Sequence, residues 1–437
     1  MIEGKGYCYG NIRKMNVLIC TVGGTPEPLI ESIKNRCPDF VYFIASQETN
    51  PIIGKIVENT NLDIGKYRSA IIDDAESIIE AYEISRDIIR KIKKEYPTAR
   101  IFINHTGGTK SMSAGIVLAG SEYGCSFVYV GGEKRDKGGV GIVTEGMIVK
   151  DEQYPYYLIA EKNLTRAIDY FNRYQYDTSI NILKSIIDRL VDDSEKSKQL
   201  QITATILIDF IILIKNIDRF RFRKIEYRGQ NRYALGIVND VIKRLEMVGF
   251  SSDILRNIDD YLKISKDYFR GLQEGDPKII LCELINNAER RISEGKYDDA
   301  IARLYRAFEL IAQIKLQEYG LDDLSDKKFT LKDLENRGVD VEKYKDCVDE
   351  KGKLKLGLKK KFELLKDLGW DNADDIYLEN KKIWELLSKR NNSIMAHGLE
   401  PIDMKSTMDL FSEVEKIAKD MVKDYDWIKE IGKFPTL

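Results

Sequence analysis

Two histidines occur in this chain, and each lies in a segment whose residue types could do chemistry. His397 follows Arg390 and Asn391 closely, and His105 stands in a glycine-rich turn. Histidine transfers protons near neutral pH, so a search for acid–base chemistry narrows to these two places. One lies near the C-terminus in a helical pattern and the other in the N-terminal third, which indicates two sites with different tasks.

The residues before His397 have apolar side chains at helical spacing: Ile383, Trp384, Leu386, Leu387 and Ile394. We expect a helix that runs toward His397 and ends at Gly398 and Pro401. Six residues separate Arg390 from His397, which places them about two turns apart on one side of that helix. A long arginine can then share one phosphate with the imidazole, and Asn391 adds an amide. Such a spacing alone is typical of surface residues, but no other histidine follows Ala160.

Two glycine turns follow strand-like runs, Thr21-Val22-Gly23-Gly24-Thr25 and the segment from Asn104 to Ser111. Ligands of open parallel sheets bind outside the carboxyl ends of the strands, where backbone N–H groups and helix N-termini attract anions. Lys110 adds a point charge suited to phosphate. Neither turn has the glycine spacing of a dinucleotide or ATP loop, which disfavours an NAD-type oxidoreductase. The alternative to ligand binding is a purely structural role, in which both turns only reverse the chain direction and cap the following helix. His105 fits a turn residue or a secondary ligand contact better than a base.

Apolar runs alternate with helical patterns from Met15 to about Tyr157 and predict strands at 16–21, 40–45, 68–72, 100–104 and 126–130. Residues 140–143 and 147–149 predict a terminal hairpin. Strands separated by helices indicate a parallel sheet covered on both faces. After about Ala160 the pattern is helical throughout. The predicted fold class is therefore an α/β Rossmann-like N-terminal domain followed by all-α regions.

Composition excludes several classes of protein. At 437 residues the length predicts two or three domains, and a net charge of −2 gives no global basic field for nucleic acid. The six cysteines are scattered without Cys-x-x-Cys, which favours a reducing cytosol. The apolar run 202–214 is shorter than the roughly 20 residues that span a bilayer and contains Asp209. We therefore expect a buried helix, a cytoplasmic protein and no membrane partner.

Basic and aromatic residues alternate over 215–233. This alternation suits contact with single-stranded RNA, and it equally suits an ordinary strand or the solvent-exposed edge of a helix.

The two glycine turns together resemble the CRISPR-associated Rossmann-fold (CARF) family over about residues 15–157. In that family the turns frame a cleft on a dimer two-fold that binds cyclic oligoadenylate. The resemblance implies that this activator is the ligand, with the tetra-adenylate favoured over the hexa-adenylate and no cofactor. By position, the residues expected to line the cleft are Thr21, Gly23, Gly24, Thr25, Asn104, Thr106, Gly107, Gly108, Thr109, Lys110 and Ser111. Weaker candidates are Ser46 and Gln47.

The segment Arg390-Asn391 followed by Ala396-His397-Gly398 resembles the motif of HEPN ribonucleases, over about residues 277–431. The resemblance implies metal-independent cleavage of single-stranded RNA, in which the substrate's own 2′-hydroxyl attacks the adjacent phosphorus. His397 would transfer protons, Arg390 would stabilise the phosphorane, and Asn391 would assist. No cluster of metal-ligand spacing accompanies the pair. In that family one Arg–His pair from each protomer of a homodimer forms the composite site.

Together these features predict residues 1–14 as an extension, 15–160 as a CARF sensing domain, 161–275 as a helical middle region and 276–437 as a HEPN ribonuclease domain. The predicted function is a cyclic-oligoadenylate-activated endoribonuclease of type III CRISPR antiviral defence. The alternative is a cyclic-nucleotide sensor whose helical half binds a partner without catalysis. An RNase assay with and without ligand separates the two.

Overall fold

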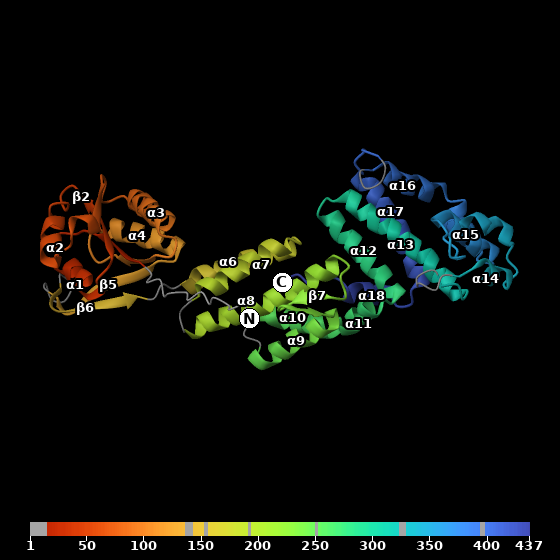
Figure 1. Cartoon of the computed structure of the whole chain (residues 1–437), viewed down its shortest axis with the longest axis horizontal. Coiled ribbons are helices and arrows are strands. Elements are labelled where there is room, and N and C mark those ends of the chain that lie inside the picture. The colour runs from red at the N-terminus through yellow and green to blue at the C-terminus, as the bar shows by residue number, and fades with distance from the viewer. Residues whose placement is uncertain are drawn as a thin grey trace, which may run out of the picture. The chain divides into compact units, whose positions relative to one another are not determined.

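A computed structural model of the chain describes residues 15–135, 143–152, 156–190, 194–249, 252–322, 329–393 and 398–437 (Figure 1). Its contacts divide the chain into two compact units, one of Met1–Glu161 with Arg189–Ser197 and one of Lys162–Asp188 with Lys198–Leu437. The first holds the sheet and the second is almost entirely helical. The finer predicted boundaries, including the one between a middle region and a C-terminal domain at residue 276, stay predictions.

The N-terminal unit is built on one mixed sheet with the strand order β3-β2-β1-β4-β5-β6. Its strands are β1 (Asn16–Thr21), β2 (Phe40–Ser46), β3 (Tyr67–Ile72), β4 (Arg100–Asn104), β5 (Ser126–Arg135) and β6 (Val143–Glu152). The first five are parallel, as predicted, and β6 runs antiparallel to β5. The predicted hairpin was partly wrong, because β6 is one strand that pairs with β5. Val140 lies outside the described residues.

Helices cover both faces of this sheet, and β1 shows why. Val17 and Ile19 belong to one buried cluster, and Leu18 and Cys20 to another. Successive side chains of a strand point to opposite faces, so a continuous apolar run needs cover on both sides. The first cluster includes residues of α3 (Ile78–Glu95) and α4 (Lys110–Tyr123), and the second residues of α1 (Glu27–Arg36) and α2 (Ile52–Thr60). A short 3-10 turn, η1 (Ile64–Lys66), precedes β3.

The strand order reverses beside β1. The chain leaves β1 for β2 and β3 on one side, and β4 returns to the other side of β1. The carboxyl ends of β1 and β4 are therefore neighbours, with Cys20 paired to Asn104. In an open α/β sheet this reversal opens the crevice where ligands bind. Both predicted glycine turns start there.

The second unit contains helices and one small hairpin. Its N-terminal part has α6 (Tyr156–Asn172), α7 (Tyr176–Arg189), α8 (Glu195–Asp218), β7 (Ile225–Tyr227), β8 (Gln230–Arg232), α9 (Ala234–Val248), α10 (Asp253–Ile264) and α11 (Lys266–Glu274). The division of units passes through α6, the end of α7 and the start of α8. There follow α12 (Pro277–Ser293), α13 (Tyr297–Glu318), α14 (Leu331–Glu335), η2 (Val341–Cys347), α15 (Leu358–Asp367), the π-helical turn η3 (Asp374–Leu378), α16 (Lys381–Asn392), α17 (Met404–Met421) and α18 (Tyr425–Ile431).

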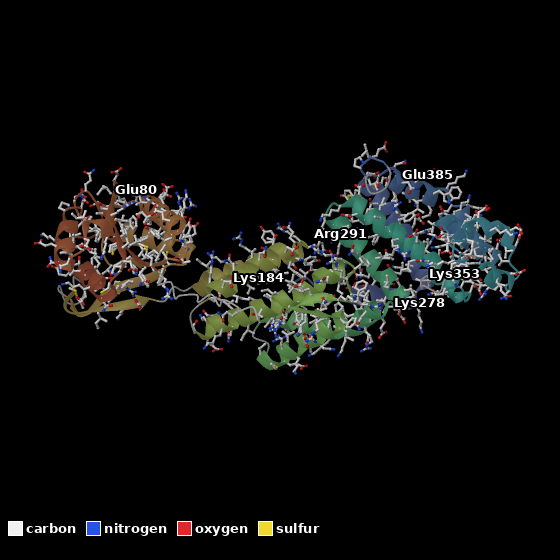
Figure 2. The ribbon with its side chains drawn as sticks, viewed as in Figure 1. Glu80, Lys184, Lys278, Arg291, Lys353 and Glu385 are labelled. Atoms are coloured by element: carbon white, nitrogen blue, oxygen red, sulfur yellow. The ribbon has the colours of Figure 1, made fainter. Side chains whose placement is uncertain are left out.

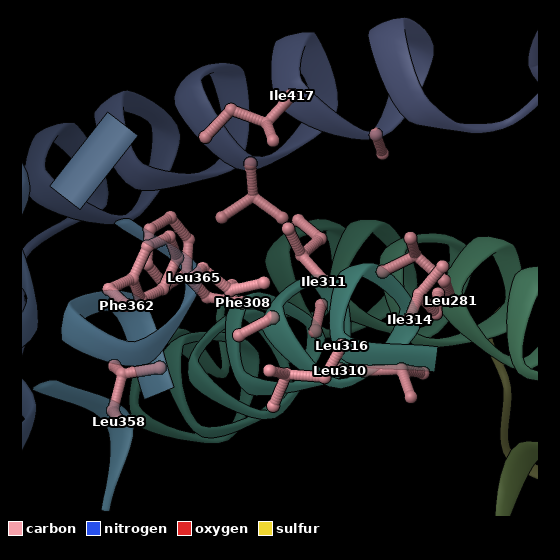
Figure 3. Close-up of a cluster of buried hydrophobic side chains, with 14 of the residues drawn as sticks. Leu281, Phe308, Leu310, Ile311, Ile314, Leu316, Leu358, Phe362, Leu365 and Ile417 are labelled. Carbon is pink, nitrogen blue, oxygen red and sulfur yellow. The ribbon is translucent and has the colours of Figure 1, made fainter. Parts of the chain in front are cut away.

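The C-terminal helices share one apolar core. Side chains of α12, α13, α15, α16 and α17 form a single buried cluster. Figure 3 shows members from α12, α13, α15 and α17. Phe308 of α13 and Phe362 of α15 stack in its middle, with ring centroids 5.4 Å apart. Large aromatic side chains contribute more buried area than most aliphatic ones, so they anchor the packing of such a core. This core fixes α13 against α16, the helix that ends near the predicted catalytic pair.

Helix α8 is long and apolar enough to cross a membrane by length and composition, although 56% of its most apolar window is buried within the protein. It is longer than the predicted apolar run. Asp209 in its middle is buried and forms ion pairs with Arg228 at 2.8 Å and with Arg244. A buried carboxylate held by two arginines is typical of a helix that packs inside a protein, as the sequence predicted.

A buried network of charges ties α8, α11 and α12 together. Arg290 lies between two carboxylates, with Nη2 2.5 Å from Glu283 Oε1 and Nε 2.8 Å from Asp218 Oδ1. Tyr268 donates to Glu283 Oε2 at 2.5 Å, and Arg291 reaches Asp218 at 2.8 Å. Burial raises the pKa of the Glu283 carboxyl, and Arg290 and Tyr268 oppose that rise. The buried charges therefore depend on one another.

Removing one member should destabilise this unit strongly, because the remaining charge is buried without compensation. Arg290→Met or Glu283→Leu should each cost about 3–5 kcal/mol, and the double variant less than the sum of the two. Urea unfolding followed by circular dichroism measures this. Lys278→Ala, an exposed cation on the same helix (Figure 2), is the control and should change little. Equal midpoints for Arg290→Met and Lys278→Ala would contradict the structural role of the network.

Candidate functional site

The two glycine turns of the N-terminal unit contact each other through their backbones. A Cβ atom at Gly107 would lie 2.5 Å from the Thr21 carbonyl oxygen, and one at Gly23 would lie 2.7 Å from the Gly108 nitrogen. Gly108 also has a φ of +82°, which favours glycine. These glycines are therefore required for the close approach of the turns. The structure thus brings together the two turns that the sequence singled out.

Several of the predicted ligand side chains make hydrogen bonds inside the turns. Thr21 is buried and donates its hydroxyl to the Gly107 carbonyl at 2.6 Å. Thr106 Oγ1 accepts from Val130 N at 2.9 Å. Thr109 caps α4 by accepting from Met112 N at 3.1 Å, and it donates to the Ala75 carbonyl. These hydroxyls therefore stabilise the conformation of the turns through hydrogen bonds within the protein.

Asn104 is the exception among the buried polar residues of the turns. Its Oδ1 accepts from Thr106 N at 2.9 Å, whereas its Nδ2 is buried and has no partner among the described residues. A buried donor without an acceptor costs free energy, so such groups usually serve a ligand or a water molecule. Of the predicted ligand residues, Asn104 therefore has an unused donor.

The remaining predicted positions reach the surface to different degrees. Gly24, Gly108, Lys110 and Gln47 are exposed, and Gly23, Thr25, Thr106, Gly107, Thr109 and Ser111 are half-buried. Ser46 is buried and its hydroxyl lies 3.3 Å from that of Thr49. Lys110 and Ser111 begin α4, so the backbone N–H groups at the start of this helix lie at the crevice end of the sheet, next to an exposed lysine. This arrangement can hold an anion.

His105 packs as an aromatic side chain. Its ring stacks on Tyr129 with centroids 5.8 Å apart and meets Phe127 edge-on at 6.2 Å. The loop before α3 also reaches the second turn, because Ala75 accepts from Thr109. Nothing in the sequence pointed to that loop, since a backbone carbonyl carries no residue signature.

The predicted catalytic helix is shorter than expected. Helix α16 ends at Asn392, five residues before His397, and Ser393 takes an extended conformation with φ −84° and ψ 164°. The prediction that this helix continues to Gly398 was therefore wrong. The Ser393 hydroxyl donates to the Arg390 carbonyl at 2.8 Å, which satisfies a carbonyl at the helix end. His397 itself lies outside the described residues.

Backbone hydrogen bonds join the residues before and after the segment 394–397. Gly398 N donates to Ser393 O at 3.2 Å, and Glu400 N donates to Asn392 O at 3.3 Å. A Cβ atom at Gly398 would collide with the Asn392 carbonyl oxygen, so only glycine fits. The chain therefore returns to the end of α16 at Gly398, the residue that follows His397.

Arg390 lies in the last turn of α16, where the helix dipole favours a cation. Its guanidinium lies 4.7 Å from the centre of the Tyr305 ring of α13, and Nη1 is 3.3 Å from Asn391 Oδ1. Sequence reasoning missed Tyr305, because nothing marks one aromatic of a core helix as the neighbour of a distant arginine. Nearby, two hydrogen bonds from Ser406 lower the pKa of the Asp403 carboxyl to about 2.

The basic and aromatic segment 215–233 forms the end of α8 and the β7–β8 hairpin. Many of its cations have protein partners: Lys215 and Arg219 contact Asp177, and Arg228 contacts Asp209. Arg223 Nε donates to the Gln273 carbonyl at 2.7 Å. These ion pairs account for much of the positive charge of the segment. Across the described ranges no three His, Cys, Asp or Glu side chains gather as metal ligands.

Comparisons with known proteins agree with this architecture. Residues 271–420 match the family profile described as the Csm6 HEPN domain. A search of curated proteins found no match. Csm6 from Enterococcus italicus, solved bound to cyclic hexa-2′-fluoro-hexa-dAMP, aligns with a TM-score of 0.60 and 14% identity, over 96% of this chain and 98% of that chain.

Two further solved structures align less well. Can2 from Sulfobacillus thermosulfidooxidans, in complex with cyclic tetra-adenylate, has a TM-score of 0.24 and 12% identity over 47% of this chain and 66% of its own. Protein VC1899 from Vibrio cholerae has a TM-score of 0.26 and 11% identity over 60% of this chain and 70% of its own. Neither alignment is good enough to carry an argument about this fold.

The alignment with the Enterococcus protein spans nearly the whole of both chains, and the profile match includes α16 and Arg390. The described order of elements, a Rossmann-like sheet followed by helices, fits both findings. Residues 271–420 therefore resemble the Csm6 HEPN domain, and the chain as a whole has the fold of the Enterococcus italicus Csm6 structure.

Proposed function

We propose that this protein is a metal-independent endoribonuclease for single-stranded RNA, activated by cyclic oligoadenylate in type III CRISPR defence in the cytoplasm. One observation carries the proposal. Arg390, a cation without a carboxylate partner in the described part of the chain, ends α16 within the segment that matches the Csm6 HEPN family. His397 follows it in the sequence. An unpaired arginine near a histidine is suited to a phosphate that gains charge during reaction.

The proposed reaction needs only these side chains and the substrate. The 2′-oxygen of the RNA attacks the adjacent phosphorus, forms a bond to it and displaces the 5′-oxygen of the next nucleotide. The 2′-hydroxyl loses a proton and the leaving 5′-oxygen gains one; His397 transfers one of these protons, and the histidine of the second protomer or a water molecule transfers the other. Arg390 stabilises the additional charge on the phosphorane, and Asn391 lies beside its guanidinium.

We propose that the protein acts as a homodimer. Three apolar side chains near the end of α16 are exposed: Leu399 by 88%, Met404 by 55% and Met408 by 42%. Met404 and Met408 lie one turn apart on α17, which packs against α16. An exposed apolar patch beside a catalytic group favours a protein interface. A second copy there would bring two Arg–His pairs together, as the resemblance implies.

The crevice between the two glycine turns is the proposed activator site. It offers the start of α4, the exposed Lys110 and the unused donor of Asn104. The phosphates of a cyclic oligoadenylate would bind the start of α4 and Lys110, and its acceptor atoms would bind the Asn104 amide. The tetra-adenylate is the preferred ring of this proposal, and the hexa-adenylate is the competing one.

His397→Ala and Arg390→Ala should each abolish RNA cleavage while activator binding and dimerisation remain. Loss of a positioned acid or base costs about 10²–10⁴ in rate. Lys381→Ala, an exposed residue at the other end of α16, should leave the rate unchanged. A fluorogenic RNA assay measures this, and a chelator should not slow the wild-type protein. Full activity of His397→Ala would remove the histidine from the mechanism.

Lys110→Ala should weaken oligoadenylate binding, because a hydrogen bond to a charged group contributes about 1.5–3 kcal/mol. The variant should need more activator yet reach a near-normal maximal rate. Calorimetry with both ring sizes measures the affinity. Lys91→Ala, an exposed cation on α3, is the control. Thr109→Ala is a less clean test, since it also removes the cap of α4. Unchanged affinity in Lys110→Ala would place the activator elsewhere.

Binding at the two sites should be reciprocal. A ligand shifts an equilibrium only by binding one state more tightly than the other, and linkage requires equal factors in both directions. A non-cleavable RNA analogue titrated into His397→Ala with and without activator gives one factor. The activator titrated with and without that RNA gives the other. If the RNA affinity were the same with and without activator, and the activator affinity the same with and without RNA, activation would have to act on the chemical step alone.

A further inference from the structure

Arg390 differs from the arginines of the neighbouring helices. Those of α12 and α13 all contact carboxylates: Arg290 with Glu283 and Asp218, Arg291 with Asp218 and Glu294, Arg303 with Asp299, and Arg306 with Glu309. Arg390 has no carboxylate within ion-pair distance among the described residues, and its Nε is buried without an acceptor there. Its charge is therefore not neutralised by any described side chain.

The Tyr305 ring takes the place of a carboxylate. The Arg390 guanidinium carbon lies 4.7 Å from the ring centre, which is within the range of a cation–π contact. Burial raises the pKa of the Tyr305 hydroxyl, Glu309 raises it further and Arg390 lowers it. The phenol therefore stays neutral at physiological pH, and the ring contacts the guanidinium through its π face.

The ring is itself held by the core. Tyr305 is half-buried and packs against the apolar cluster of the C-terminal helices. Its neighbours Leu304 and Phe308 are fully buried, so the α13 backbone at this point has little freedom. A guanidinium that lies on a fixed ring loses much of the rotamer freedom of a long side chain. An ion pair would also fix it, but the carboxylate would compete with the substrate phosphate.

We propose that Tyr305 is a positioning residue for Arg390, which orients the guanidinium toward the scissile phosphate and leaves its charge available to it. This inference rests on the proposed ribonuclease function. Tyr305 does not touch the reacting atoms in this scheme and acts only through Arg390. The aromatic face is the required feature, and the hydroxyl is dispensable.

Tyr305→Leu should lower kcat about tenfold or more, because small displacements of a charge-stabilising group are costly in the transition state. KM for RNA should change much less. Tyr305→Phe should restore the rate to near wild type, since it keeps the ring. Tyr319→Leu is the matched control, because Tyr319 is the C-cap residue of α13, packs against the same core and contacts a cation, Lys315. Equal losses in Tyr305→Leu and Tyr319→Leu would reduce Tyr305 to a packing residue.

A double-variant cycle tests whether Tyr305 acts through Arg390. In Arg390→Lys the compact ammonium cannot stack on the ring as a guanidinium does. Adding Tyr305→Leu should then change the single-turnover rate, measured with excess enzyme, by less than about twofold. A full tenfold loss in that background would overturn the proposal.

A readout without catalysis separates this inference from the proposed function. The Nε–H resonance of Arg390, assigned with Arg390→Lys in protein labelled with ¹⁵N-arginine, should be shifted by the ring current of Tyr305. Tyr305→Leu should move it toward the position of a free arginine, and Tyr319→Leu should not. If wild type cleaves no RNA but the resonance moves, the ribonuclease function fails and the contact stands. If wild type cleaves RNA and the resonance does not move, the positioning role is wrong.

Discussion

The packing of the helical unit depends on one buried guanidinium, that of Arg290. Arg290 needs both Glu283 and Asp218, which lie far apart in the sequence, so α12 has one allowed position against the end of α8. The constraint continues into α13 through Asn287, which donates to the Asp218 carbonyl at 2.8 Å and accepts from Arg303. Because α13 also packs against α16, the buried charges support a helix on which α16 rests. Polar contacts that are satisfied inside a protein define geometry more strictly than apolar packing alone.

The N-terminal unit depends on a different constraint, the closeness of two backbones. Gly23 and Gly107 let the turns after β1 and β4 meet, and the Thr21 hydroxyl joins them. Because Thr21 and Thr109 make internal hydrogen bonds, their side chains have little capacity left for a ligand. The groups left for a ligand are the backbone N–H groups at the start of α4, the exposed Lys110 and the Nδ2 of Asn104, which has no partner among the described residues.

Features that depend on local periodicity could be predicted from the sequence, and those that depend on tertiary contacts could not. The continuous apolar run of β1 and the glycines after it indicated the covered sheet and its crevice. The end of α16 was missed, because apolar spacing continues to Ile394 while Ser393 terminates the helix through its hydroxyl and an extended backbone. The internal bonds of Thr109 and the contact of Tyr305 with Arg390 join residues far apart in the sequence. No pattern along the chain encodes such pairs.

The support of Arg390 by a ring has a consequence for ionic strength. Salt weakens contacts between exposed charges, with a screening length of about 8 Å at physiological concentration. An arginine oriented by an exposed carboxylate would lose its orientation as salt rises, whereas one that lies on Tyr305 keeps it. In the proposed ribonuclease, attraction of RNA to this cation would still be screened. Dissolved ions should therefore weaken the capture of the polyanion and leave the orientation of Arg390 largely intact.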